Sequence, residues 1–465
     1  MSPSPANSLI RLDTRWVRAG ELSTGGLSPA DFEGLREASA KAHRELSRTE
    51  RFGFFTLADP ATPAWRESAK AAKAAWKKNF TDFVILGIGG SALGAKTLQQ
   101  ALAPETIPGA PKPGKVRVRI LDNVDPGTLL PVLNALDPKK TLVNVVSKSG
   151  TTVETAAQFL LLAKKFRAAL GKKWKDHFVL TTDPEKGELR RLAREENVLT
   201  LDVPPNVGGR YSVLSAVGLF PAAILGIDGK KILAGAASMK ERCGAENLLQ
   251  NPAYFFAAAH VLLAKKGGNV NVLFPYSEKL EFLARWFCQL WGESLGKKKG
   301  SERIGLTPTV ALGTTDQHSQ LQLYLDGPRD KVITTLSVES HGTDAAIPAS
   351  LPGAKESGVN FLYGKKLGAL FDAERDATKA ALARNGVSLL DLRIPAISAH
   401  SLGELFFFFE VATAFAGLLL EIDPLDQPAV EEGKRLAAAL LGKKDGEEDA
   451  RALTPYRSPD PKFVL

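Results

Sequence analysis

Apolar and polar residues follow two different periods along the chain, and the change between them marks its organisation. In residues 31–49 and 64–78, apolar positions recur at the three- and four-residue spacing that is typical of amphipathic helices. After residue 80 the pattern changes to short apolar runs, each followed by a loop and then by a helical segment. Residues 83–86, 87–91 and 92–103 are the first strand, glycine-rich loop and helix of this kind.

The same order of strand, loop and helix repeats through the rest of the chain. Residues 141–146, 147–152 and 153–168 repeat it first, and the alternation restarts near residue 269 in a second section. Strands that alternate with helices predict a parallel sheet covered on both faces. The remaining expected elements are strands 177–181, 198–203, 269–274, 309–312 and 331–338 and helices 184–195, 278–295 and 317–325.

The predicted fold class is α/β, with two subdomains of related design. Each is expected to be a mainly parallel sheet flanked by helices, a three-layer sandwich, and helical extensions lie at both ends of the chain. The length of 465 residues agrees with two or three units. The expected boundaries are 1–80 for an N-terminal helical segment, 81–220 for the first subdomain, 221–265 for a helical connector, 266–421 for the second subdomain and 422–465 for a C-terminal helix and tail.

One segment, residues 402–420, is apolar enough to suggest a membrane span. It contains four consecutive phenylalanines, but Glu404 and Glu410 lie within it, and an acidic side chain that faces lipid is costly. We therefore expect a buried core helix and no membrane partner. Residues 1–20 are polar and charged, unlike a secretory signal, so we expect a cytoplasmic protein.

The net charge of the chain limits the kinds of molecule that we expect it to bind. The formal net charge is +9, and a basic surface can attract nucleic acid or a small anion. Lysines form short clusters within 172–175 and 297–299, without the aromatic and basic pattern of a nucleic-acid module. We expect a small anionic partner and no nucleic acid, and a solvated basic surface without a role remains the alternative.

The residue spacings that hold metals or cofactors do not occur in the sequence. Cys243 and Cys288 have no partner spacing for a disulfide or a metal site. No His-Glu-x-x-His, Cys-x-x-Cys or compact His and Asp cluster is present, and the loop at Gly87 lacks the later glycine of a dinucleotide fingerprint. We therefore expect neither a metal nor a cofactor.

Two loops between a strand and a helix have a composition that suits a bound phosphate. The first contains a glycine cluster at the start of a helix, where backbone N–H groups can face an anion, although tight turn packing explains it equally well. The second, residues 147–152, supplies four hydroxyls and an ammonium, more than helix capping requires. The expected phosphate-binding residues are Gly90, Ser91, Ser147, Lys148, Ser149, Thr151 and Thr152.

Three motifs resemble those of the phosphoglucose isomerase family, and the resemblance as a whole runs from about residue 83 to about residue 440. Residues 88–94 read IGGSALG, and residues 206–218 read NVGGRYSVLSAVG, which is the most specific match. Residues 423–434 read DPLDQPAVEEGK, with Pro428 where an aromatic residue is usual. The resemblance implies two sugar-isomerase subdomains and the interconversion of glucose 6-phosphate and fructose 6-phosphate through a cis-enediol.

The resemblance also implies roles for individual side chains. A single carboxylate can move a proton between C2 and C1 of the sugar, and Glu293 is similar to the family's base. Gln289 shares a helix face with it and resembles a substrate-contacting glutamine. Arg210 would stabilise the enediolate, and His318 and Lys434 would share ring opening. Without the resemblance, these residues could be exposed helix positions or an ordinary salt bridge.

The resemblance implies a homodimer in which His318 is contributed across the interface. Two other functions remain open, namely an isomerase for another hexose phosphate and a non-enzymatic regulator that senses sugar phosphates. The combination of Arg210, Glu293, His318 and Lys434 argues against the first alternative. The presence of Glu293 argues against the second, because a sensor does not need a catalytic base.

Overall fold

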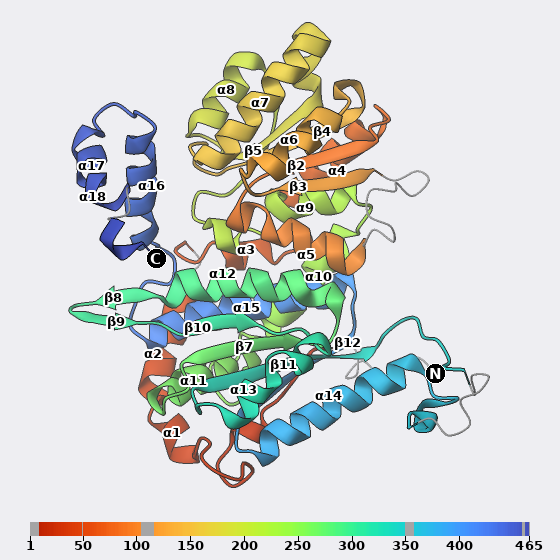
Figure 1. Ribbon diagram of the computed structural model, residues 1–465, viewed down its shortest axis with the longest axis vertical. Coiled ribbons are helices and arrows are strands. Elements are labelled where there is room, and N and C mark those ends of the chain that lie inside the picture. The colour runs from red at the N-terminus through yellow and green to blue at the C-terminus, as the bar shows by residue number, and fades with distance from the viewer. Residues whose placement is uncertain (1–8, 49, 104–115, 349–357, 458–460, 465) are drawn as a thin grey trace.

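The computed structural model describes residues 9–48, 50–103, 116–348, 358–457 and 461–464. Two five-stranded sheets lie at opposite ends of the long axis of the molecule, with helices packed around each (Figure 1). Every strand pair in these sheets is parallel except the one at an edge of the second sheet. The predicted α/β class, with two mainly parallel sheets flanked by helices, is confirmed.

The first sheet has the strand order β3-β2-β4-β5-β6. Its central strands are continuous apolar runs because both faces are covered: in β2, Phe83 and Ile85 face one helical layer, and Val84 and Leu86 face the other. The elements are β2 (Asp82–Leu86), β3 (Arg117–Leu121), β4 (Thr141–Val146), β5 (Phe178–Thr182) and β6 (Leu199–Asp202), with α4 (Pro63–Trp76), α5 (Leu93–Leu102) and α9 (Ala216–Ile224) on one face and α6 (Pro126–Ala135), α7 (Val153–Leu170) and α8 (Glu188–Glu196) on the other.

The second sheet has the strand order β1-β12-β11-β7-β10, with β1 antiparallel at its edge. One face packs against α13 and α14, and the other packs against the largest apolar core of the molecule. The elements are β1 (Arg11–Asp13), β7 (Val270–Pro275), β10 (Thr307–Val310), β11 (Lys331–Ser340), β12 (Ser388–Ala396), α13 (Leu321–Asp326), α14 (Leu367–Arg384), α10 (Gly229–Arg242), α11 (Pro252–Lys265), α12 (Glu281–Leu295) and α15 (Ala399–Leu419).

Three local expectations differ from the structure. The expected helix 31–49 is divided into α1 (Pro29–Glu33) and α2 (Arg36–Leu46), because α1 ends at Gly34. The N-terminal segment also contributes the edge strand β1, and the helix expected at 317–325 begins only at Leu321. His318 therefore ends a 3-10 turn, η8 (Thr315–His318), and does not begin a helix. The remaining short elements are α3 (Phe54–Leu57) and the hairpin of β8 (Lys297–Lys299) and β9 (Glu302–Ile304).

The apolar segment 402–420 lies in α15, which passes through the core. By length and composition α15 could cross a membrane, but its apolar window is 89% buried inside the protein. Glu404 lies 3.5 Å from a guanidinium nitrogen of Arg242, whereas the carboxyl of Glu410 has no hydrogen-bond partner among the described residues. Burial raises the pKa of Glu410 well above its ordinary value, because a charged carboxylate there would lose its hydration. The predicted core helix is confirmed.

The chain ends in three short helices that stand to one side of the two sheets (Figure 1). A turn at residues 420–428 separates α15 from α16 (Ala429–Leu440), as the sequence predicts. The last two helices are α17 (Glu447–Ala452), which packs on α16, and α18 (Thr454–Arg457). This C-terminal arm, residues 429–457, carries Lys434.

Candidate active site

A cluster of hydroxyls lies in the loop between β4 and α7. The Ser147 Oγ is 3.0 Å from the Thr152 Oγ1 and accepts a hydrogen bond from the backbone N–H of Gly150. The Ser149 Oγ accepts from both the backbone N–H and the hydroxyl of Thr151. The loop follows a buried parallel strand and precedes a helix, at the sheet edge where α/β proteins bind ligands. Its hydroxyls and the free N–H groups of α7 suit an anion.

Lys148 of this loop bonds to the protein itself. Its ammonium donates to the backbone carbonyls of Pro205 at 2.6 Å and Val207 at 2.9 Å. Burial lowers the pKa of Lys148, while the nearby carboxylate of Asp183 opposes that shift. Lys148 therefore holds the segment that leads to Arg210 against the hydroxyl loop.

The glycine loop after β2 makes close backbone contacts with two other parts of the site. A side chain at Gly90 would overlap the backbone of Gly209 and Arg210. At Gly89, which has a φ of +57°, a Cβ would lie 2.6 Å from the side-chain nitrogen of Gln289. Only glycine allows this approach, so the loop, the arginine segment and α12 meet at one place.

Arg210 is buried and joins three parts of the chain. It lies in η6 (Gly209–Tyr211), between β6 and α9. Its Nε donates to the Ser294 Oγ at 2.7 Å, and its Nη1 donates to the Gln427 Oε1 at 2.7 Å. Its Nη2 donates to the carbonyls of Pro424 at 2.7 Å and Asp426 at 2.9 Å. The planar guanidinium thus fixes the turn before the C-terminal arm against α12.

Glu293 lies near the end of α12, where two donors contact its carboxylate. The Gln289 Nε2 donates to Oε1 at 3.0 Å from one helical turn earlier, and the Arg210 Nη1 lies 3.5 Å from Oε2. The Glu293 side chain is 34% exposed, so solvent and ligands can reach it. The surroundings of Glu293 therefore orient its carboxylate, place a fixed positive charge beside it and leave it accessible to a ligand.

Three further residues of this cluster were not found from the sequence. Ser294 and Gln427 accept hydrogen bonds from Arg210, and the ammonium of Lys297 bonds to the backbone carbonyl of Glu293. Gln427 lies inside the DPLDQP motif, and Ser294 and Lys297 lie within four residues of the expected base. The positions of the motifs indicated that these segments lie near the site. The individual contacts depend on side-chain directions, which only the fold supplies.

Among the described residues, no hydrogen bond or ion pair joins His318 or Lys434 to Glu293. His318 is exposed at the end of η8, and within the described ranges its side chain makes no hydrogen bond. Lys434 is 61% exposed on α16 and pairs with Glu431 at 2.7 Å. The residues that the structure does bring together are Gly90, Arg210, Gln289 and Glu293, with Lys148 joining the hydroxyl loop to the arginine segment.

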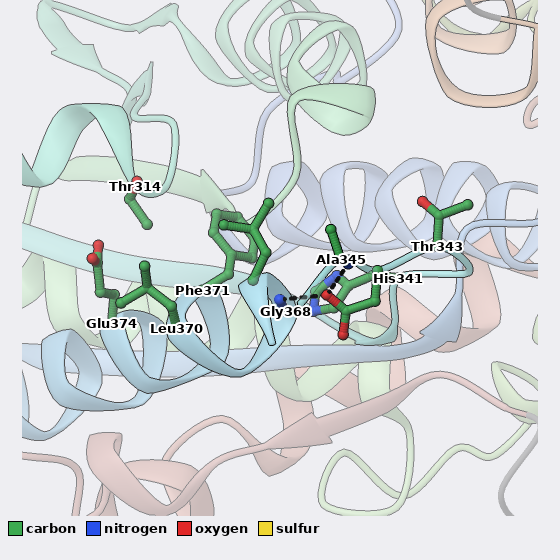
Figure 2. A pocket seen from close by; sticks show the side chains of 10 residues that line it. Thr314, His341, Thr343, Ala345, Gly368, Leu370, Phe371 and Glu374 are labelled. Atoms are coloured by element: carbon green, nitrogen blue, oxygen red, sulfur yellow. Dashed lines mark hydrogen bonds between the residues drawn. The ribbon is translucent and has the colours of Figure 1, made fainter. Parts of the chain in front are cut away.

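A separate cavity of about 520 Å³ lies between the ends of β10 and β11 and the start of α14. Figure 2 shows Phe371 and Leu370 lining it beside His341 and Glu374. The carboxylate of Asp344 accepts hydrogen bonds from two backbone N–H groups, and these bonds keep its pKa below the ordinary value. Acidic side chains would repel a phosphate, so this cavity does not suit a sugar phosphate.

The cluster around Glu293 has the parts that a proton transfer on a phosphorylated sugar requires. Glu293 is a positioned carboxylate, Arg210 is a fixed cation beside it, and the hydroxyl loop can hold an anion. No group of three or more His, Cys, Asp or Glu in the described part of the chain could hold a metal ion. The fold and the site together define an α/β enzyme of the sugar-phosphate isomerase class.

Comparisons with known proteins identify the family. The family model described as phosphoglucose isomerase matches residues 66–339. The chain is 42% identical to a glucose-6-phosphate isomerase from Carboxydothermus hydrogenoformans, over 98% of this chain and 99% of that protein. It is 47% identical to one from Rubrobacter xylanophilus, over 78% and 83% of the two chains. The chain belongs to the phosphoglucose isomerase family.

Two solved structures have a similar fold. A crystal structure described as a hypothetical protein from Thermus thermophilus has a TM-score of 0.82 and 37% identity, over 93% of this chain and all of that chain. A glucose-6-phosphate isomerase from Chlamydia trachomatis has a TM-score of 0.77 at 22% identity, over 97% and 93% of the two chains. The second likeness concerns the fold alone.

Proposed function

We propose that this enzyme interconverts glucose 6-phosphate and fructose 6-phosphate, with Glu293 as the base that moves the proton. The observation that carries the proposal is the paired contact of Gln289 and Arg210 with the two carboxylate oxygens of Glu293. Curated relatives that cover nearly the whole chain are glucose-6-phosphate isomerases, which are enzymes. A regulator that only senses sugar phosphates is therefore not favoured.

In the proposed reaction, the sugar ring first opens and the base then acts on the open chain. Glu293 takes the C2 proton of the aldose, the C1 carbonyl oxygen gains negative charge, and protonation of that oxygen gives the cis-enediol. The C2 hydroxyl then loses a proton in exchange for the one that the C1 oxygen gained, and Glu293 returns its proton to C1 to form the ketose, so the proton count balances. Arg210 stays charged throughout, and its fixed positive charge beside Glu293 stabilises the negative charge that develops on the substrate oxygen.

The hydroxyl loop is the proposed phosphate site. Ser147, Ser149, Thr151 and Thr152 present their hydroxyls before the N-terminus of α7, which favours negative charge. Gly90 and Ser91 lie on the glycine loop that contacts Arg210 and Gln289. Lys148 would act mainly by positioning, because its ammonium is bonded to two backbone carbonyls.

We assign ring opening to His318 and Lys434. His318 is exposed and makes no side-chain bond within the described ranges, as a residue that serves a neighbouring chain would. We therefore propose a homodimer in which His318 completes the partner's site. Lys434 lies on the C-terminal arm. The turn that precedes this arm is bonded to Arg210 through the backbone carbonyls of Pro424 and Asp426.

Mixing two inactive variants tests the shared site. A hybrid of Glu293→Gln and His318→Ala chains has one site with both changes and one site with neither. Unfolding and refolding the variants together should therefore recover about a quarter of the parental activity, since half of a random mixture is hybrid. Recovery of no activity, from variants that refold alone, would place His318 within its own chain's site or outside catalysis.

The isomerase assay itself uses fructose 6-phosphate, EDTA and a coupled dehydrogenase that detects glucose 6-phosphate. Glu293→Gln keeps the shape of the side chain and removes its basicity, so kcat should collapse with little change in stability. Glu281→Gln, at the start of the same helix, is the matched control and should retain kcat. A Glu293→Gln variant with parental kcat would show that another group is the base.

The cytoplasmic location stays a prediction.

A further inference from the structure

Lys297 lies immediately beyond the catalytic helix, and its ammonium is buried. Its side chain is only 7% exposed, although it begins a hairpin whose next lysine, Lys298, is exposed. The Lys297 Nζ donates to the backbone carbonyls of Glu293 and Asp426, both at 2.8 Å, and lies 3.3 Å from the Asp426 carboxylate. Burying a charged group is costly unless it gains hydrogen-bond or ionic partners, so the contacts of the Lys297 ammonium indicate a specific role for this residue.

The first contact stabilises the turn that carries the base. The last carbonyls of a helix have no partner within the helix, and the helix dipole makes that end negative. The Lys297 ammonium satisfies the carbonyl of Glu293 itself and places a positive charge at the end of α12. Removing it would loosen the final turn of the helix and so widen the range of positions of the Glu293 carboxylate.

The second contact is shared with Arg210. The carbonyl oxygen of Asp426 accepts from Lys297 at 2.8 Å and from the Arg210 Nη2 at 2.9 Å. Arg210 also bonds to Pro424 and Gln427 in the same turn. Lys297 and Arg210, two buried cations on different elements, therefore hold the turn 424–427 against the end of α12. Because they share an acceptor, the orientation of each side chain depends on the other.

We propose that Lys297 is a positioning residue for the isomerase reaction, which holds Glu293 and the turn 424–427 in the geometry that Arg210 requires. This inference rests on the proposed function. Lys297 does not itself touch the reacting atoms, because its donors are used by Glu293 and Asp426.

The positioning role predicts a kinetic signature that general destabilisation does not produce. Phosphate binding by the hydroxyl loop on the other subdomain does not involve Lys297, so KM should change less than twofold. A misplaced base should lower kcat by about 10- to 100-fold.

The experiment compares Lys297→Met with Lys297→Gln and with the control Lys298→Met. Lys297→Gln removes the charge but keeps an amide donor group, so it reports on the inference even if Lys297→Met does not fold. Both Lys297 variants should show the lower kcat and the retained KM, whereas Lys298→Met should match the parent in both.

Two results would overturn the inference. One is a folded Lys297 variant with parental kcat. The other is a variant whose kcat and substrate affinity fall together with its melting temperature, because that pattern describes a structural lysine. A parent enzyme without isomerase activity would instead refute the proposed function, and the role of Lys297 with it.

Discussion

Replacing Arg210 with lysine tests whether the site depends on a guanidinium or only on a positive charge. Arg210 donates five side-chain hydrogen bonds, to Ser294, Glu293, Gln427, Pro424 and Asp426. A lysine keeps the charge but has three donors on one nitrogen and lacks the planar fork. It can therefore serve at most three of the five acceptors, and the shorter side chain would have to reach them from one point.

The expected loss can be worked out from these contacts. At least two of the five hydrogen bonds are lost, and one hydrogen bond that involves a charged group contributes about 1.5–3 kcal/mol. Arg210→Lys should therefore lower the free energy of unfolding by about 3–6 kcal/mol, a large part of the 5–15 kcal/mol that is typical of a domain. The fixed positive charge beside Glu293 is also displaced, so kcat should fall by about 10²- to 10³-fold.

Two measurements check this prediction. Urea denaturation gives the change in the free energy of unfolding, and the coupled assay at a temperature where the variant remains folded gives kcat. Arg191→Lys is the matched control, because Arg191 is exposed and pairs only with Glu188 and Glu195 on its own helix. That variant should leave both quantities unchanged.

Each measurement can refute a different part of the reasoning. An Arg210→Lys variant as stable as the parent would show that the hydrogen bonds to the turn 424–427 do not contribute as the structure indicates. A variant that is less stable but has the parental kcat would show that Arg210 is structural and that another group stabilises the enediolate.

Three further outcomes are expected. Relative to the parent, Glu410→Gln should become more stable as the pH rises from 5 to 8, because burial raises the folded pKa of Glu410 above its ordinary 4.5. A difference between the urea midpoints of variant and parent that is the same at both pH values would contradict this. Gly90→Ala should lower kcat at least tenfold by displacing the Arg210 backbone, unlike Gly127→Ala, where a Cβ meets its nearest neighbour at 3.5 Å. Lys434→Met should lower kcat while the melting temperature stays unchanged, since its pair with Glu431 is exposed.

Much of the fold could be predicted from the sequence, because burial leaves a pattern in the order of residues. The run from Phe83 to Leu86 is apolar throughout since each of its side chains meets a helical layer, and this made β2 and its neighbours visible. The helix α15 was also predicted, because Glu404 and Glu410 exclude a lipid environment. The strand β3 and the helix α14 were missed, and β1 was not expected, because edge and partly exposed elements leave a weaker pattern. The strand β12, which is buried between β1 and β11, was also missed.

The sequence also indicated where the chemistry lies, through the loops and the residues around Glu293. It could not show that Arg210 bonds to Pro424, 214 positions away, or that Lys148 holds the carbonyl of Val207. Local patterns record which residues avoid water and which loops can bind an anion. The direction of a side chain, and the distant carbonyl that it meets, depend on how the two sheets and the C-terminal turn pack, and only the tertiary structure decides that.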